Sequence, residues 1–317
     1  MDPLSSVIGL LRPLGTTVGA TDVGGDIAIG FAAHEGAFFY SVAAGRCWLA
    51  VDGVAEPLLL RAGDCIVLPS GRPFTLASDL RLAPIPAERV FEGRPNGSIA
   101  VYNGGGRCTM FAAHFEFQAD ASRFLLGALP PVVAVRDAQA RAALRATLDQ
   151  MIDELRCAAP GCDAIVEHLA HIALVKVLRF HLSEAGGERP GWLFALADPR
   201  MGAVMAAMHA DLARAWTVGE LAEVGAMSRT TFATRFKSIV GVAPMAYLAS
   251  LRMLTAVKRL GEPGARTSDV AIATGYQSEA AFNVAFKRVL GLPPRRYMSL
   301  HSEASAVTRG PFHQDPG

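Results

Sequence analysis

The segment Gly225–Tyr247 recurs fifty residues later as Gly275–Tyr297. At that offset eight positions of the 23-residue window are identical, where chance predicts about one or two. These residue types set turns, helix ends and cores, so the chain must build one small unit twice. The identical pairs are Gly225/Gly275, Ser228/Ser278, Phe232/Phe282, Phe236/Phe286, Lys237/Lys287, Gly241/Gly291, Pro244/Pro294 and Tyr247/Tyr297.

The first copy has the pattern of a helix, a tight turn and a second helix. Thr217 and Glu220 have the spacing of a capping box, which predicts a helix to about Val224. Gly225 opens the turn because glycine permits a positive φ. Ser228 then caps a helix to about Ile239, whose inward positions are predicted to be Phe232, Phe236 and Ile239. Residues 217–239 therefore predict a helix-turn-helix, in which the second helix enters the DNA major groove.

The second copy, residues 267–289, repeats this logic. Thr267 or Ser268 caps a helix to about Thr274, and Ser278 caps a helix to about Val289. Between the copies, residues 245–260 predict a connecting helix about 24 Å long. The two units could then enter successive major-groove segments, about 34 Å apart. The inward positions of the connecting helix are predicted to be Leu248, Leu251, Leu254 and Val257.

Charge separates this region from the rest of the chain. Residues 200–300 carry 13 Lys and Arg against 6 Asp and Glu, a net +7. The other residues carry 17 against 23, a net −6, and the two parts sum to the overall +1. A basic domain of this kind favours a phosphate-bearing partner such as double-stranded DNA, whereas an accidental surface bias is the alternative.

Side chains that project outward from the second helix of each copy are the candidates for reading bases, since Asn pairs with adenine and Glu accepts from cytosine. The base-facing candidates are Arg229, Thr230, Ala233, Thr234, Glu279, Ala280, Asn283 and Val284. Other basic residues are predicted to contact phosphates, which holds register without distinguishing bases. They are Arg235, Lys237, Arg252, Lys287, Arg288, Arg295 and Arg296. The alternative is a helical bundle whose phenylalanine stripes are only core.

At 317 residues the chain is expected to have two domains. Residues 22–117 have short apolar runs between glycine turns, which predict a β-sandwich or barrel, and residues 120–184 predict helices. Residues 185–199 are expected to be a linker, 200–300 the helical domain, and 301–317 a flexible tail. The helix at 163–182 is apolar almost all round, so it belongs either to the core or to a subunit interface.

Apolar run lengths, the N-terminal residues and the cysteine count indicate in which compartment the protein is expected to act. No apolar run reaches the roughly 18–20 residues of a membrane span. The start, Met1-Asp2-Pro3, lacks the basic residues of a secretory signal. Five cysteines form an odd set without a close framework. We therefore expect a cytoplasmic protein without a membrane partner and without structural disulfides.

Residues 200–300 resemble the DNA-binding domain of AraC/XylS-type transcription regulators, through motifs that match in order over about a hundred residues. The resemblance implies a homodimer that contacts RNA polymerase. Such regulators often place an arginine in a base-facing position, where this chain has Thr234 and Val284. The matching residues are Leu221-Ala222, Met227-Ser228, Phe232, Arg235-Phe236-Lys237, Gly241, Pro244, Tyr247-Leu248, Arg252-Met253, Val270-Ala271, Gly275-Tyr276-Gln277-Ser278-Glu279, Phe282, Phe286-Lys287, Gly291, Pro294 and Tyr297.

The N-terminal half resembles a cupin, because Gly63, Pro69 and Gly71 have the spacing of a cupin motif. Three positions that hold metal ligands in cupins are apolar here, namely Ala32, Phe38 and Phe74, and only His34 remains. One imidazole does not make a catalytic metal site, which needs about three protein ligands. We therefore expect no catalytic residues and no cofactor. The competing interpretation is a metal-dependent cupin enzyme with an accessory helical domain, which stoichiometric iron, manganese or nickel would support.

The full arrangement is similar to regulators with a degenerate cupin sensor. It implies an α+β, two-domain fold: a cupin-like β-barrel with a helical dimerisation region, then an all-α domain with two helix-turn-helix units joined by a central helix. A third interpretation is a pure interaction module built around the helix at 163–182, which sedimentation with and without DNA would separate from a DNA-binding dimer.

Two signals compete for the sensor. A small, largely apolar effector is predicted to enter the barrel near His34, Phe38, Trp48 and Phe74, although aromatic residues in a small barrel also serve as simple packing. Alternatively, oxidation of cysteines is the signal, with Cys47, Cys65 and Cys108 as candidates. Inert buried thiols are the alternative for these cysteines.

Overall fold

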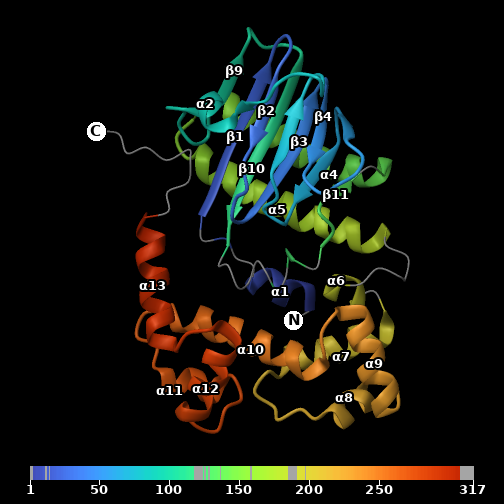
Figure 1. Cartoon of the computed structure of the whole chain (residues 1–317), viewed down its shortest axis with the longest axis vertical. Coiled ribbons are helices and arrows are strands. Elements are labelled where there is room, and N and C mark those ends of the chain that lie inside the picture. Colours follow the sequence, from blue (N-terminus) through green and yellow to red (C-terminus); the bar gives the residue numbers. More distant parts are fainter. Residues whose placement is uncertain are drawn as a thin grey trace. The chain divides into compact units, whose positions relative to one another are not determined.

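Two sheets pack across one core in the N-terminal half of the chain (Figure 1). Their strand orders are β11-β6-β3-β10-β1-β9 and β5-β4-β7-β2-β8. The strands are β1 (Gly15–Val23), β2 (Ala28–Phe31), β3 (Ala37–Ala44), β4 (Arg46–Val51), β5 (Leu58–Arg61), β6 (Cys65–Leu68), β7 (Phe74–Ala77), β8 (Ile85–Pro86), β9 (Ile99–Tyr102), β10 (Cys108–Glu116) and β11 (Val133–Val135).

This computed structural model describes residues 3–10, 13, 15–117, 124, 126–127, 129–135, 137–157, 159–184, 191–196 and 198–307. The chain divides into two units. The sheet unit comprises Pro13–Ala119 and Leu129–His181. The helical unit comprises Leu182–Thr308 together with Met1–Arg12 and Asp120–Ala128.

Alternating burial explains which strand residues form the core. Along β4, Cys47, Leu49 and Val51 are buried, while Trp48 and Ala50 are half-buried on the opposite face. Strand β10 pairs antiparallel with both β1 and β3, so it lies between two strands of its sheet. The resulting core joins side chains from both sheets.

The sheets extend beyond the predicted barrel limits of 22–117. Strand β1 begins at Gly15, and β11 pairs with β6 from within the region 120–184 that was expected to be helical. Inside the predicted β region, the short strands β2, β7 and β8 and the short helix α2 (Ala87–Phe91) add to the architecture. These segments are too short to show a clear hydrophobic period, so only their pairing partners define them.

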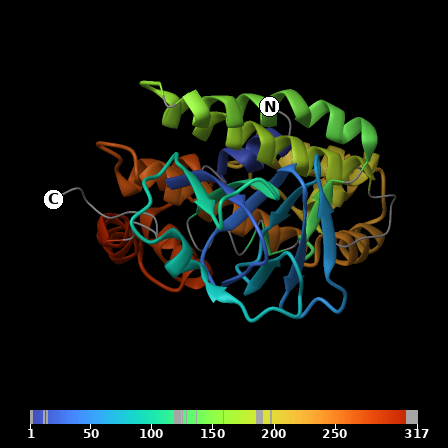
Figure 2. The same ribbon diagram turned by 90° about the horizontal axis from the view of Figure 1, so that it is seen from above.

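Two long helices complete the sheet unit. Helices α4 (Ala138–Cys157) and α5 (Cys162–Glu184) lie side by side (Figure 2), and Lys176 of α5 donates to Thr147 of α4 at 2.9 Å. The ring of His171 packs on Phe115 of β10, and its Nε2 lies 2.9 Å from Thr16 Oγ1. Much of α5 is therefore core, yet Ile165 and Ile172 are 42% and 46% exposed.

The helical unit is organised around α10, which lies between two groups of helices (Figure 1). Leu248, Leu251, Leu254 and Val257 of α10 are buried, which confirms their predicted inward positions. The helices are α1 (Pro3–Leu10), α6 (Trp192–Ala195), α7 (Pro199–Ala210), α8 (Val218–Val224), α9 (Arg229–Val240), α10 (Pro244–Leu260), α11 (Thr267–Ala273), α12 (Glu279–Leu290) and α13 (Pro294–Val307).

Three predicted boundaries differ from the structure. Helix α6 lies inside the predicted linker 185–199 and packs on α9, with Trp192 only 2% exposed. Helix α13 continues to Val307, into the predicted tail, whereas residues 308–317 lie outside the described residues. Residues 1–184 were predicted to form the N-terminal domain, but helix α1 packs on α7 and α10 of the helical unit. A helix of only eight residues is stable only when it packs on other elements.

Candidate DNA-binding site

The first predicted helix-turn-helix is formed by α8 and α9. The capping box at the start of α8 is complete: Thr217 Oγ1 accepts from the Glu220 amide at 3.2 Å, and Glu220 Oε2 accepts from the Thr217 amide at 2.8 Å. The Arg214 guanidinium, together with Thr217, lowers the pKa of Glu220 to about 2. Ser228 caps α9 through the Thr231 amide at 3.2 Å, as predicted.

Each copy of the repeat is held by the same stack of three rings. In the first copy Phe236 packs edge-on against Phe232 at 5.6 Å and against Tyr247 at 5.7 Å between ring centroids. In the second copy Phe286 lies 5.5 Å from both Phe282 and Tyr297. All six rings are at most 1% exposed. Ile239, predicted to face inward, is only half-buried, and Val240 takes the buried position.

The turns of the two helix-turn-helix units differ in which residue has a positive φ. In the first turn Ala226, not Gly225, has the positive φ of +48°, while Gly225 has φ −80°. In the second turn Gly275 itself has φ +85°. Space around Gly225 is also limited, since a Cβ there would lie 2.6 Å from Met227 Cε and 3.2 Å from Val204 Cγ2, so both side chains would have to shift. The expectation of a positive φ at Gly225 is therefore wrong.

The helix ends also show one difference between the copies. Helices α9 and α12 both end on a left-handed glycine, Gly241 and Gly291, whose amides donate to the lysine carbonyls four residues back. Ser278 caps α12 through the Ala281 amide at 3.2 Å. Helix α11 begins after Arg266 without a side-chain cap, so the predicted caps Thr267 and Ser268 are wrong.

Most of the residues predicted to face DNA bases lie on the outer surface of α9 and α12. Six of them are exposed, and Ala233 and Asn283 are half-buried. Val284 is 72% exposed, a large fraction for an apolar side chain in a helix with a complete core. The exposed residues are Arg229, Thr230, Thr234, Glu279, Ala280 and Val284.

Two of the predicted phosphate contacts are engaged inside the unit. Arg252 donates to the carbonyls of Leu212 at 2.8 Å and Arg214 at 2.7 Å, and its guanidinium lies over the Tyr276 ring. Burial lowers the pKa of Arg252. Arg252 therefore has a structural role, which corrects the prediction. Arg235 is ion-paired with Asp198, the cap of α7. The remaining candidates are exposed: Lys237, Lys287, Arg288, Arg295 and Arg296.

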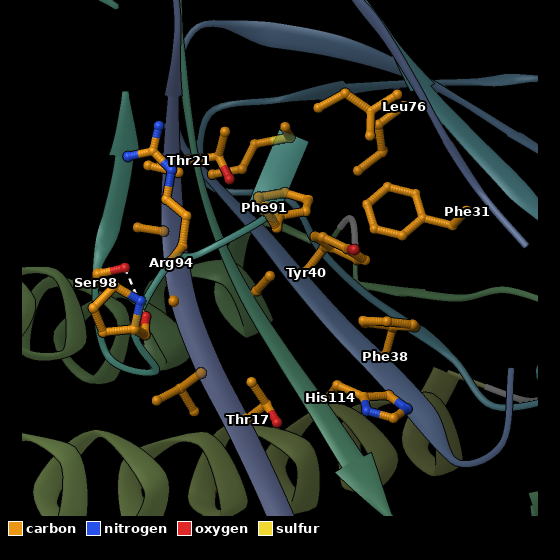
Figure 3. A pocket seen from close by; sticks show the side chains of 18 residues that line it. Thr17, Thr21, Phe31, Phe38, Tyr40, Leu76, Phe91, Arg94, Ser98 and His114 are labelled. Atoms are coloured by element: carbon orange, nitrogen blue, oxygen red, sulfur yellow. Dashed lines mark hydrogen bonds between the residues drawn. The ribbon is translucent and has the colours of Figure 1, made fainter. Parts of the chain in front are cut away.

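A cavity lies inside the sheet unit (Figure 3), with about 630 Å³ of free space including its open mouth. Its lining is largely apolar and aromatic, with a few polar groups at Thr17, Arg94, Ser98 and His114. Phe38, a predicted effector contact, lines it. The other aromatic and large apolar lining residues are Val18, Ile29, Phe31, Tyr40, Leu76, Phe91 and Met110.

The other predicted effector contacts lie outside this lining. Phe74 stacks on Phe31 at 4.4 Å and supports the cavity from behind. His34 packs edge-on against Phe38 at 4.7 Å, and burial is the main cause of its lowered pKa. Trp48 points to the opposite face of β4, where it lines a separate surface hollow, so it does not contact the cavity. The inward residues of β4, Cys47 and Leu49, do not line the cavity either.

The cupin metal positions do not fit a metal in this chain. Phe38 and Phe74 occupy two of them and pack together at 5.5 Å between ring centroids, and Ala32 is exposed. Among the described residues, no three His, Cys, Asp or Glu side chains gather closely enough to hold an ion. Over the same residues, no single helix is long and apolar enough to cross a membrane, and only the bent pair α9 and α10 passes that test of length and composition.

The three candidate redox cysteines are buried. Cys65 is fully enclosed, and burial raises its pKa to about 12. Cys47 and Cys108 lie together in the core of the sheet unit. Sequence reasoning grouped the three cysteines but did not identify this pair, because β4 and β10 belong to different sheets.

Comparison with known proteins matches both halves of the chain. Residues 2–183 match the Cupin family, and residues 221–299 match a helix-turn-helix domain. A putative AraC-like transcription regulator of Streptomyces lividans is 40% identical over 298 residues, 94% of this chain and 98% of the relative. The regulator AlkR of Acinetobacter baylyi is 31% identical over 243 residues, 74% of this chain and 79% of the relative.

Among solved structures, the DNA-binding domain of AdpA in complex with a target DNA is 32% identical, with a TM-score of 0.31, and covers 34% of this chain and 95% of that chain. The two family matches and the near full-length similarity to the Streptomyces lividans relative agree with the architecture described above. The chain therefore belongs to the AraC family of DNA-binding transcription regulators, with a cupin-like N-terminal domain.

Proposed function

We propose that α9 and α12 enter successive major-groove segments of double-stranded DNA and read different bases there. The observation that supports this is a duplicated scaffold with a diverged outer face. The ring stacks, the serine caps of α9 and α12 and the glycines recur in both copies, whereas all four base-facing positions differ between them. Conserving the core while varying the outer face fits two reading helices with different base preferences.

The proposed roles follow from side-chain chemistry. Asn283 presents an amide that pairs with adenine, and Glu279 presents an acceptor for cytosine. Val284 and Ala280 offer apolar contact to a thymine methyl. Lys237 and Lys287 hold both helices to the phosphate backbone, since they are the exposed charged pair conserved between the copies.

Replacing Asn283 is expected to relax specificity at one base pair. The Asn283→Ala variant should lose about 1–3 kcal/mol, roughly 5- to 150-fold, on a site with the preferred adenine. It should lose little on sites already changed at that base. Sites would be selected from random DNA, and binding measured by fluorescence anisotropy.

Lys287→Ala is the matched control from the same helix. It should weaken all sequences about equally, because a phosphate contact does not distinguish bases. If Asn283→Ala also weakens every sequence equally, the side chain does not read a base and the proposed docking of α12 is wrong.

We propose that the regulator works as a cytoplasmic homodimer that contacts RNA polymerase, and that it has no enzymatic activity. The dimer proposal rests on Ile165 and Ile172, which are exposed on α5 although its other face is core. Sedimentation velocity would contradict it if the chain remained a monomer with and without a paired DNA site. The apolar cupin positions and the regulator relatives support a non-enzymatic role.

We further propose that the cavity of the sheet unit receives a small, mostly apolar effector. The lining from Phe31, Phe38, Tyr40 and Phe91 suits an aromatic or aliphatic body. Arg94, which has no ion-pair partner among the described residues, is available to a polar or anionic end of the same molecule.

A cavity-filling variant tests this site. The aromatic sulfonate 8-anilinonaphthalene-1-sulfonate should bind the native chain saturably at one site per chain, with a rise in fluorescence. Ala112→Trp adds an indole to the cavity wall and should abolish that binding. Ala50→Trp, on the opposite face of β4, is the control that should leave it intact. Equal binding by all three proteins would rule out the cavity as the site.

A further inference from the structure

Three sulfur atoms meet between the two sheets of the sheet unit. Cys47 comes from β4, and Cys108 and Met110 come from β10. The Cys47 thiol donates to Met110 Sδ at 3.3 Å, and Cys108 lies two residues before Met110 on the same buried face of β10. All three side chains are at most 6% exposed and belong to one apolar cluster.

The backbone holds the two cysteines together. Gly45, in the turn between β3 and β4, has φ +78° and lies directly on the segment that precedes β10. A Cβ at Gly45 would lie 2.0 Å from the Arg107 carbonyl oxygen and 3.0 Å from Cys108 Cα. This close approach fixes the start of β4 against the start of β10, and so holds the backbones of Cys47 and Cys108 near each other.

The two thiols are chemically unequal. The neighbouring Cys47 side chain lowers the pKa of Cys108, and the Arg46 amide and the Arg107 charge act in the same direction against the effect of burial. The neighbouring Cys108, followed by burial, raises the pKa of Cys47. Cys108 is therefore the better thiolate, and Cys47 is placed to attack an oxidised Cys108 sulfur.

Positive charge gathers beside the start of β4. Arg46, Arg61 and Arg107 line a surface hollow there, and their charges favour a thiolate nearby. Cys65 offers a contrast within the same unit. It is 0% exposed, its thiol lies 3.9 Å from the Gly63 carbonyl, and burial raises its pKa to about 12.

We propose that Cys47 and Cys108 form an oxidisable pair that peroxide converts into a disulfide linking the two sheets. The Cys108 thiolate attacks one peroxide oxygen, the O–O bond breaks, and Cys108 sulfenic acid and water form after proton uptake. The Cys47 thiol then displaces the hydroxyl as a second water and completes the S–S bond. Two thiols lose two electrons, and one hydrogen peroxide becomes two waters.

The proposed Cys47–Cys108 disulfide would lie next to a residue that lines the cavity described above. Met110 contacts Cys47 with its sulfur and also lines the cavity. Moving Cys47 toward Cys108 removes the partner of Met110 and alters one cavity wall. This site belongs to the chemistry of the sheet unit and is independent of the proposed DNA contacts.

Peptide mapping of the full chain tests the pair. Protein treated with hydrogen peroxide, blocked with N-ethylmaleimide and digested without reductant should yield a Cys47–Cys108 cross-linked peptide that dithiothreitol removes. Cys47→Ser should instead accumulate a sulfenic acid on Cys108 that dimedone labels. Cys108→Ser should give neither product, and Cys65→Ser should behave as the native chain.

Several results would overturn the proposal. One is oxidation confined to the thiols of Cys157 and Cys162, at the ends of α4 and α5. Another is a sulfoxide on Met110 with both core thiols still free. Circular dichroism of each variant before oxidation separates loss of the cross-link from loss of the fold. Dimedone labelling of Cys108 in a folded Cys47→Ser protein keeps the proposal testable even if Cys108→Ser unfolds.

Discussion

Raising the salt concentration from 50 to 200 mM is expected to weaken binding of each chain to its DNA site about 500-fold. The five exposed basic residues left after excluding Arg235 and Arg252 predict a slope of about −4.5 in log K against log salt, at about −0.9 for each phosphate contact. Those residues are Lys237, Lys287, Arg288, Arg295 and Arg296. Fluorescence anisotropy over a salt series measures the slope directly.

Single substitutions give this prediction a residue-level control. Lys287→Ala should reduce the slope by about one. Arg252→Ala should leave the slope unchanged, because its guanidinium is bound to the Leu212 and Arg214 carbonyls, and should destabilise the helical unit instead. A slope near zero for the native chain, or a loss of slope in Arg252→Ala, would contradict the assignment of phosphate contacts.

Phe282→Ala is expected to destabilise the helical unit by about 3–5 kcal/mol, the cost of removing a fully buried aromatic ring. Phe282 is 0% exposed and lies 5.7 Å from Tyr276 and 5.5 Å from Phe286 between ring centroids. Its loss leaves a void between α10, α11 and α12 that the neighbouring helices cannot fully close. Urea denaturation followed by circular dichroism measures the change.

Phe232→Ala tests the corresponding ring of the first copy and should have a similar effect, since Phe232 is also 0% exposed. Val284→Ala, two residues after Phe282 in the same helix, is the matched control. Because Val284 is 72% exposed, its truncation should change the stability by no more than about 0.5 kcal/mol. Equal losses at positions 282 and 284 would mean that α12 does not present the face described here.

Local signals made the helical unit predictable from the sequence. Thr217, Ser228 and Ser278 cap helices by hydrogen bonds to residues three positions away, so spacing alone identifies them. Seven of the eight identical pairs of the repeat have structural roles in turns, caps or ring stacks. Lys237 and Lys287 are the exposed exception.

Contacts between distant residues were not predictable in this way. The carbonyls bound by Arg252 lie 38 and 40 residues earlier in the chain, so its charge alone suggested a phosphate contact. The meeting of Cys47 with Cys108 depends on how two sheets face each other, which no local pattern encodes. Trp48 was predicted to contact the effector because the sequence alone does not show toward which side of the sheet its side chain points. The pairing of β4 with β5 and β7 determines this.

In the proposed docking on DNA, the unequal outer faces of α9 and α12 give each bound chain a polarity. Because Arg229, Thr230, Ala233 and Thr234 correspond to Glu279, Ala280, Asn283 and Val284, the element read by one chain cannot be inverted without exchanging what each helix meets. A promoter can therefore place two of these DNA elements head-to-head or head-to-tail. A dimer whose two chains have a fixed relative orientation fits only one of these two arrangements. Orientation of the recognition element, as well as its composition, then becomes part of the regulatory code.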